Sequence, residues 1–227
     1  MGFILIGLLA AAFVFLPGFW VKHVLQKYSK PPDRYSGTGK QLARHLLDQY
    51  GMPEVKIEET NEGDHYDPIT KVVRLTPEKF NGRSLTAITV AAHEVGHALQ
   101  DHKGYKPLRY RTYLVKATKK FEKLGAAILM LSPFMGALTR IPGLGIMMFL
   151  GGLFALGTST VVHLITLPTE IDASFNRALP MLEENQILKQ PDKKHARRLL
   201  RAAALTYVSA SLTSLLNIAR WFAILRR

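Results

Sequence analysis

The sequence predicts a mainly α-helical integral membrane protein with about three to four transmembrane helices and a small β-hairpin. Two observations support this prediction. Apolar residues make up 48% of the 227-residue chain, and they concentrate near the N-terminus, from 124 to 167 and from 202 to 225. Basic residues cluster at 22–30, 106–123 and 189–201. Each cluster borders an apolar run, as is typical of loops that flank membrane helices.

Charge and cysteine content narrow the possible functions. The formal net charge is +13 and the chain contains no cysteine. Because the basic clusters border apolar runs, they favour contact with anionic lipid head groups of a bilayer over binding to nucleic acid. The lack of cysteine excludes disulfides, thiolate metal ligands and cysteine nucleophiles. A transition metal would therefore have to be held by His, Asp or Glu.

Residues 1–21 are predicted to be an uncleaved transmembrane anchor. The run Phe3–Val21 carries no charge and is long enough to cross a bilayer as a helix. A cleaved signal peptide is the alternative, but no Lys or Arg precedes the apolar run. Lys22, Lys27 and Lys30 follow it, which predicts that the chain continues in the cytoplasm.

Residues 22–123 have the composition of a cytoplasmic region. Gly37–Tyr50 has the leucine spacing of an amphipathic helix, and a glycine follows it as a stop signal. Val55–Glu59 and Lys71–Leu75 are short β-prone runs separated by residues typical of turns. We therefore expect these two runs to pair as a β-hairpin.

Residues 124–167 are predicted to form a transmembrane helical hairpin. Its arms, 124–138 and 144–167, are joined by a short turn that contains a Pro-Gly pair. The first arm is short and contains Pro133, so a re-entrant segment is an alternative. Two crossings would return the chain to the cytoplasm.

Two further segments complete the predicted organisation. Residues 168–201 are expected to hold a helix that supplies a third metal ligand, followed by a basic segment. Residues 202–227 form a C-terminal apolar helix that also contains Ser, Thr, Asn and Arg residues. These polar residues leave two alternatives for it, a membrane crossing or a buried or interfacial position.

The chemistry is concentrated in the HEVGH motif. A helix is predicted to begin after Ser84 as N-cap and to end at Gly104. Within it, His93 and His97 are one turn apart and share a face, so one Zn²⁺ ion can bind both. Glu94 lies beside the metal and is the expected general base.

A third ligand is needed, and the acids after Pro168 are the candidates. Glu170 is the preferred ligand, and Asp172 is either the fallback ligand or a hydrogen-bond partner of a ligand histidine. Arg177, seven residues after Glu170 and so on the same helix face, is a candidate for stabilising the developing oxyanion, as is Tyr66. His65 is expected to belong to the turn of the hairpin.

Several segments together carry a family resemblance. Besides the N-terminal anchor they are Lys27–Lys30, Asp64–Pro68, Lys71–Leu75, Gly82–Ser84, Ala91–Ala98 and Pro168–Ser174. On these segments the chain resembles the neutral zinc metallopeptidases of bacterial membranes, the YugP type, over nearly its whole length. The resemblance implies zinc-dependent peptidase activity in an integral membrane protein of bacteria. Together with the charge and hydropathy pattern, it predicts a multi-pass plasma-membrane protein whose active site, in a zincin-like HExxH region, faces the cytoplasm.

The resemblance also implies roles for single residues. His93 and His97 correspond to metal ligands and Glu94 to the catalytic glutamate. The chain is more distantly similar to membrane proteases of the prenyl-protein and heat-shock types, in which an Asp follows the later Glu by four residues. Here that position is Ser174 and the Asp is Asp172, which leaves the partners of the ligand histidines open.

The predicted function is therefore that of a membrane-bound zinc endopeptidase acting on a peptide or membrane-protein substrate. Zinc held by the two histidines and Glu170 would polarise the peptide carbonyl while Glu94 accepts a proton. The strand at 71–75 is expected to offer its edge to an extended substrate. The sequence predicts nothing about oligomeric state.

Two other functions compete with this prediction. One is a catalytically inactive zinc-binding membrane scaffold or adaptor, in which His65 or Asp172 would close a structural site as fourth ligand. The other is a protein that binds lipid surfaces through the basic cluster at 106–123 and has an accidental HExxH motif.

Overall fold

The computed structural model describes residues 2–206 and 208–209 of the chain. These residues divide into two compact units. The core unit comprises Pro17–Arg109 and Leu167–Thr206. The remaining residues, which include Tyr110–Thr166, belong to the hairpin unit.

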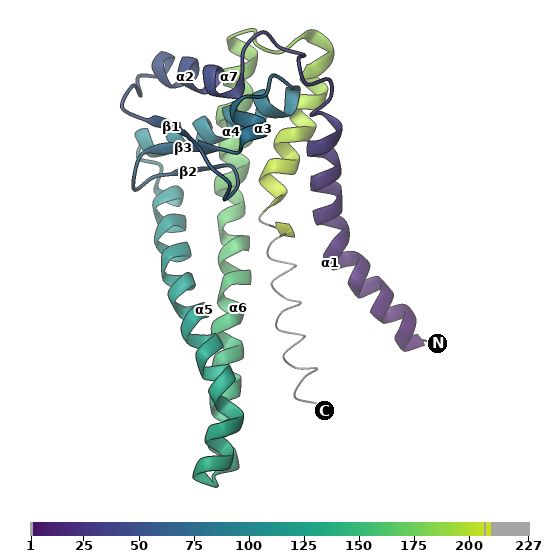
Figure 1. Cartoon of the computed structure of the whole chain (residues 1–227), viewed down its shortest axis with the longest axis vertical. Helices are drawn as coiled ribbons and strands as arrows, with labels where there is room; N and C mark the ends of the chain where they lie inside the picture. The colour runs from purple at the N-terminus through teal and green to yellow at the C-terminus, as the bar shows by residue number, and fades with distance from the viewer. Residues whose placement is uncertain (1, 207, 210–227) are drawn as a thin grey trace. The chain divides into compact units, whose positions relative to one another are not determined.

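Helices make up most of the described chain (Figure 1). In chain order, the α-helices are α1 Gly2–Lys27, α2 Gly39–Gln49, α3 Pro77–Phe80, α4 Leu85–His102, α5 Lys106–Thr139, α6 Pro142–Ile171 and α7 Leu179–Glu184. A π-helical segment, η1 (Asp172–Ala178), joins α6 to α7, and a 3₁₀ turn, η2 (Gln190–Asp192), precedes further helical residues at 193–206.

A three-stranded sheet lies beside α4 in the core unit (Figure 1). Its strands are β1 Lys56–Glu59, β2 His65–Asp67 and β3 Val72–Leu75, in the order β1-β3-β2. β3 pairs antiparallel with β2 and parallel with β1. The predicted hairpin between 55–59 and 71–75 is therefore wrong, because the intervening chain forms β2 and takes the antiparallel position. β3 is also the central strand, so it has no open edge to offer to a substrate.

Two helices of the core unit follow the sequence signals closely. α2 begins after Thr38, whose hydroxyl accepts from the Gln41 backbone N–H, while the Gln41 side chain accepts from the Thr38 N–H. This reciprocal pair is a capping box. α4 begins after Ser84, whose hydroxyl accepts from the Ala87 N–H at 3.2 Å, and Gly104 after its end has a positive φ of 66°. Both predicted helices are confirmed, with bounds within a few residues of those expected.

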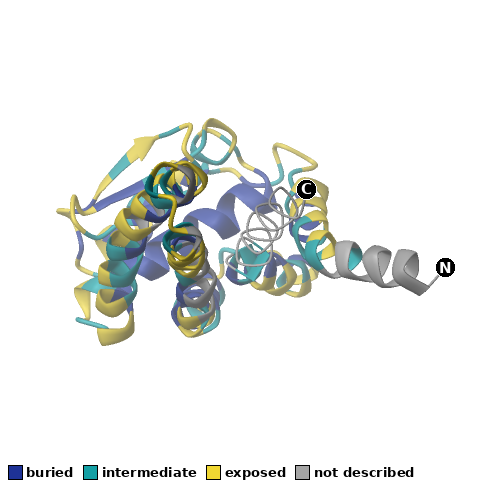
Figure 2. Ribbon diagram, turned by 90° about the horizontal axis from the view of Figure 1, so that it is seen from below, coloured by how far each residue is buried: buried dark blue, intermediate teal, exposed yellow. Residues whose placement is uncertain are grey.

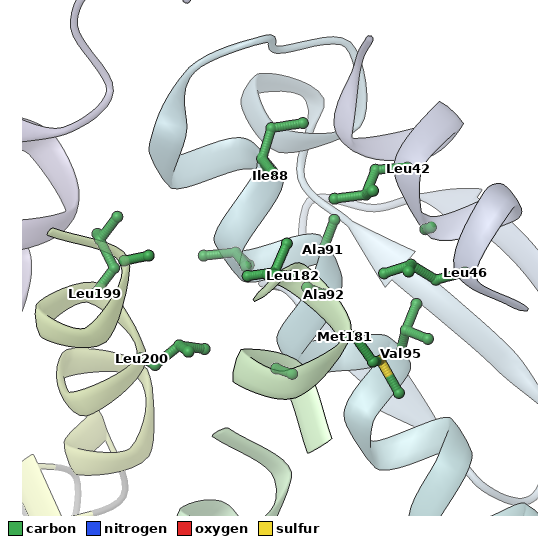
Figure 3. Close-up of a cluster of buried hydrophobic side chains, with 14 of the residues drawn as sticks. Leu42, Leu46, Ile88, Ala91, Ala92, Val95, Met181, Leu182, Leu199 and Leu200 are labelled. Atoms are coloured by element: carbon green, nitrogen blue, oxygen red, sulfur yellow. The ribbon is translucent and has the colours of Figure 1, made fainter. Parts of the chain in front are cut away.

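The apolar core of this unit lies between helices (Figure 3). In Figure 2 the buried residues, coloured dark blue, include a long helical stretch, and every residue of α4 from Leu85 to Gln100 is buried. The labelled side chains of Figure 3 come from α2, α4, α7 and the helical residues at 193–206: Leu42, Leu46, Ile88, Ala91, Ala92, Val95, Met181, Leu182, Leu199 and Leu200. Each buried Leu, Ile, Val or Met side chain contributes roughly 1.5–3 kcal/mol. This packing makes α4 a rigid support.

A buried carboxylate ties two distant segments of the core unit together. Asp192 accepts hydrogen bonds from Arg34 Nε at 2.6 Å and from the Tyr35 hydroxyl at 2.7 Å. Burial acts to raise the pKa of Asp192, but the hydrogen bonds from Arg34 and Tyr35 outweigh it. The pKa therefore lies below its usual value and the group stays ionised. The contact fixes the start of the helical residues at 193–206.

The predicted membrane fold requires correction. Among the residues that the structure describes, no helix is both long enough and apolar enough to cross a membrane. In α5 the apolar part begins only at Leu124, after the basic residues of 106–123, and about 20 apolar residues are needed for a crossing. The three to four transmembrane helices, and the multi-pass plasma-membrane localisation inferred from them, are therefore not supported. Most of the predicted last helix, 202–227, lies outside the described residues.

Candidate metal centre

Helix α4 presents both histidines of the HEVGH motif on one face. His93 and His97 are one turn apart and both are buried, with 4% and 3% of their surface exposed. Their rings meet edge to face, with centroids 4.8 Å apart and an interplanar angle of 77°. The core packing of α4 restricts this face, so the two rings are held in place before any ligand arrives.

Glu170 reaches the same face from the end of α6. Its Oε2 atom lies 3.3 Å from His93 Nε2 and 3.2 Å from His97 Nε2, and the residue is fully buried. The three atoms lie within 4.8 Å of one another. Two histidines and one carboxylate, up to 77 residues apart in the sequence (His93 and Glu170), thus converge on one point.

A glycine allows η1 to pack directly against α4. A Cβ atom placed on Gly96 would lie 2.6 Å from the backbone oxygen of Ala173. Contacts that short do not occur between real Cβ and oxygen atoms. Gly96 is therefore needed for the close approach that brings the segment after Glu170 against the histidine-bearing helix.

The hydrogen bonds of Ser174 fix the tautomer of His93. Ser174 Oγ donates to the carbonyl oxygen of Leu200 at 3.1 Å and lies 3.0 Å from His93 Nδ1. Because its one proton goes to Leu200, the hydroxyl must accept from His93. His93 therefore carries its proton on Nδ1, which leaves the lone pair of Nε2 directed at Glu170.

The hydrogen bonds of Gln100 do the same for His97. Gln100 Oε1 lies 2.9 Å from His97 Nδ1, while Gln100 Nε2 donates to the Thr169 carbonyl oxygen at 2.9 Å and to Asp172 Oδ2 at 2.7 Å. An amide oxygen only accepts, so His97 also carries its proton on Nδ1. Its Nε2 lone pair likewise faces Glu170.

This arrangement of acceptors calls for a cation. Two imidazole Nε2 atoms and a carboxylate oxygen face one another in a buried space, an arrangement that a positive charge between them stabilises. Ligand atoms bound tetrahedrally to zinc at about 2.0–2.1 Å are about 3.3–3.4 Å apart. The separations of 3.3 and 3.2 Å between Glu170 Oε2 and the two histidine Nε2 atoms fit that spacing, and all three atoms lie within 4.8 Å of one another. The residues present therefore suit zinc, the predicted cofactor.

Asp172 lies behind Gln100 instead of at the point of convergence. Besides Gln100, it accepts from Asn176 Nδ2 at 2.9 Å and from Arg177 Nε at 3.2 Å. Burial acts to raise the pKa of Asp172, but the hydrogen bonds from Gln100, Asn176 and Arg177 outweigh it. The pKa therefore lies below its usual value and the group remains a carboxylate. In a π-helix, residues five apart lie one turn apart, which brings Arg177 beside Asp172.

The other predicted residues have distinct surroundings. Tyr66 is buried, and its hydroxyl donates to Asp101 Oδ2 at 2.8 Å, an atom that also pairs with Lys71. His65 is hydrogen bonded through Nδ1 to the carbonyl oxygen of Gly63 at 2.9 Å, in its own turn. The structure places Glu94 in α4 next to His93, buried with 6% of its surface exposed.

Three contributors to the centre were missed in the sequence. Gln100 stands three residues after His97 and hence on nearly the same helix face, which is a signal that spacing alone offers. Ser174 was noted only as a departure from a related motif. The requirement for Gly96 depends on the path of η1, which no local pattern reveals.

Comparison with known proteins gives the family. The family described as "putative neutral zinc metallopeptidase" matches residues 3–226. The chain is 36% identical over 223 residues to "Putative membrane protease YugP" of Bacillus subtilis (strain 168), covering 97% of this chain and 95% of that protein. No solved structure gives a significant match. The predicted zinc cofactor is confirmed by the family and by the buried His-His-Glu group. The chain belongs to the neutral zinc metallopeptidase family.

Proposed function

We propose that this protein is a zinc-dependent endopeptidase whose metal is held by His93, His97 and Glu170. The observation that carries the proposal is the buried convergence of His93 Nε2, His97 Nε2 and Glu170 Oε2, with the Nδ1 atom of each histidine facing a protein partner. Neutral imidazoles with a free Nε2 are the form that binds zinc.

The roles of the residues follow from this ligand set. A zinc ion held by His93, His97 and Glu170 would supply Lewis-acid chemistry, the polarisation of a peptide carbonyl and a lowered pKa of a water molecule. Glu94 accepts the proton of the attacking water and passes it to the leaving amine. Ser174 and Gln100 hold the imidazole rings of His93 and His97 in position.

The oxyanion role of Arg177 or Tyr66 belongs to the same proposal. Each now has a carboxylate partner, Asp172 for Arg177 and Asp101 for Tyr66. Arg177 is the stronger candidate, because it lies close to the motif itself: a Cβ added at Gly96 would be 3.4 Å from the Cβ of Arg177. A guanidinium has five N–H groups, so one bond to Asp172 leaves others for a substrate oxygen.

An inactive zinc-binding scaffold is disfavoured by the same contacts. A structural zinc site is closed by four protein ligands, whereas catalytic sites keep three and an open position. Within the described part of the chain, the group able to hold a metal has three members. The two residues expected to complete a closed site are committed elsewhere, His65 to Gly63 and Asp172 to Gln100.

Glu94→Gln is the test of the proposed function. The variant is expected to retain one zinc per chain by metal analysis and to lose hydrolysis of a quenched fluorescent casein, because an amide cannot accept the proton. The matched control is Glu62→Gln, the same change at an exposed acid, which should hydrolyse casein at the wild-type rate. Turnover retained in Glu94→Gln, or wild-type protein that binds no zinc, would refute the proposal.

A further inference from the structure

Gln100 occupies an unusual position for a polar side chain. It is fully buried, and each polar atom of its amide has a protein partner. Nε2 carries two protons and faces two acceptors, the Thr169 carbonyl oxygen at 2.9 Å and Asp172 Oδ2 at 2.7 Å. Oε1 faces His97 Nδ1 at 2.9 Å. The amide is therefore satisfied in this one orientation.

The opposite amide orientation is unfavourable. It would place Oε1 of Gln100 against the Thr169 carbonyl and the Asp172 carboxylate, and no hydrogen bond could form with either. Leaving buried polar groups without hydrogen bonds is strongly unfavourable. Asp172 is itself held by Asn176 and Arg177, so it cannot turn away to accommodate the flip.

We propose that Gln100 is the positioning residue of His97, selecting the Nδ1–H tautomer and the ring orientation that leave Nε2 free for metal, with Asp172 acting on the imidazole only through this amide. The proposal rests on the proposed function in taking zinc as the ligand of Nε2. The tautomer itself is a property of the zinc-free chain and can be measured without it.

The contact from Asp172 through the Gln100 amide to His97 differs from a carboxylate bound directly to a ligand histidine. A direct carboxylate raises the basicity of the imidazole as well as orienting it. Here the neutral Gln100 amide lies between the Asp172 carboxylate and the His97 imidazole, and Arg177 pairs with the charge of Asp172. The function of Gln100 is therefore orientation, and a side chain that keeps an acceptor at Oε1 should preserve the tautomer.

The first experiment measures the tautomer directly. In zinc-free protein labelled with ¹⁵N-histidine, long-range ¹H–¹⁵N spectra should place the His97 proton on Nδ1. In Gln100→Leu, which removes the acceptor, the proton should move at least partly to Nε2. A wild-type spectrum with the proton on Nε2 would overturn the proposal by itself.

The second experiment measures zinc affinity by competition with a chelator. Loss of such a partner of a ligand histidine typically weakens metal binding by 10–100-fold, and Gln100→Leu is expected to fall in that range. Thr89→Val is the matched control: Thr89 is buried in the same helix, and its Oγ1 atom has no hydrogen-bond partner among the described residues. It should bind zinc as the wild type does. An affinity of folded Gln100→Leu equal to that of Thr89→Val would overturn the proposal.

A third variant keeps the proposal testable if Gln100→Leu fails to fold. Gln100→Glu retains an oxygen for His97 Nδ1–H and loses the two donated bonds, so the His97 proton should stay on Nδ1 despite a lower melting temperature. A proton on Nε2 in this variant would contradict the proposal. A chain with the expected tautomers that binds zinc but hydrolyses no casein would refute the peptidase assignment and leave the role of Gln100 standing.

Discussion

Replacing Gly96 with alanine is expected to push η1 away from α4 and to weaken zinc binding. The new Cβ would lie 2.6 Å from the Ala173 backbone oxygen, and ordinary contact begins at 3.4 Å, so the two helices must separate by about 0.8 Å. Glu170 lies two residues before η1 in the same continuous helix. Metal–ligand distances tolerate only about 0.2 Å of change. We therefore expect zinc affinity to fall at least about tenfold.

Stability gives a weaker signal than affinity for this variant. Overpacking costs typically about 1–3 kcal/mol, but alanine in a helix is favoured over glycine by about 1 kcal/mol. The net loss is therefore about 0–2 kcal/mol, or at most roughly 8 °C in melting temperature for a chain of this size. Zinc affinity by chelator competition is the assay that decides.

Gly151→Ala is the matched control for Gly96→Ala. Gly151 also lies within a helix, α6, and a Cβ added there meets nothing within 4 Å. This variant should bind zinc with unchanged affinity and melt at the wild-type temperature or slightly above it. If Gly96→Ala behaves in the same way, the close approach of η1 does not position Glu170 and the reasoning fails.

Two further predictions concern zinc removal and acid. Removing zinc by dialysis against a chelator should lower the melting temperature in a thermal-shift assay, and added zinc should restore it. At a zinc concentration 100 times the Kd, binding contributes about 2.7 kcal/mol, which corresponds to roughly 5–11 °C for a chain of this size. An unchanged melting temperature after zinc removal would contradict the prediction. Burial acts to raise the pKa of Asp67, but hydrogen bonds from Thr70, the Ile69 N–H and Arg74 outweigh it and lower the pKa to about 2. Since the pKa of Asp67 is lower in the folded state than in the unfolded one, its contribution to stability is present above about pH 4 and is lost as the pH falls toward 2. By urea unfolding, Asp67→Asn should therefore be less stable than wild type at pH 7 and should lose less stability between pH 4 and pH 2. Parallel plots of stability against pH for the two proteins would contradict this prediction.

The metal centre was largely predictable because its chemistry leaves local traces. The spacing of His93 and His97 follows directly from the period of a helix. Glu170 was selected as an acid at a helix start, and the structure places its carboxylate beside both imidazoles. Its expected place on the same side as the histidines depended on two membrane crossings, which the structure does not support. The position of Glu170 instead depends on the packing of η1 against α4.

The sheet and the apolar helices were less predictable for physical reasons. β2 has only three residues and β1 and β3 four each, too few for the hydrophobic pattern to distinguish parallel from antiparallel pairing. Apolar composition alone does not distinguish a helix that crosses a bilayer from one that packs on other helices. The expected partners, a peptide substrate and anionic lipid head groups, stay predictions.

The π-helical segment has a consequence for how such proteins are recognised. Three residues spaced by two, Glu170, Asp172 and Ser174, all contact side chains of α4. Glu170 lies beside both histidines, Asp172 accepts from Gln100, and Ser174 lies beside His93. A search pattern that demands an acid four residues after the glutamate meets Ser174 and discards the chain. The hydroxyl at that position nevertheless anchors a histidine. Patterns for these peptidases should therefore specify a hydrogen-bond acceptor for each imidazole and leave its residue type and spacing free.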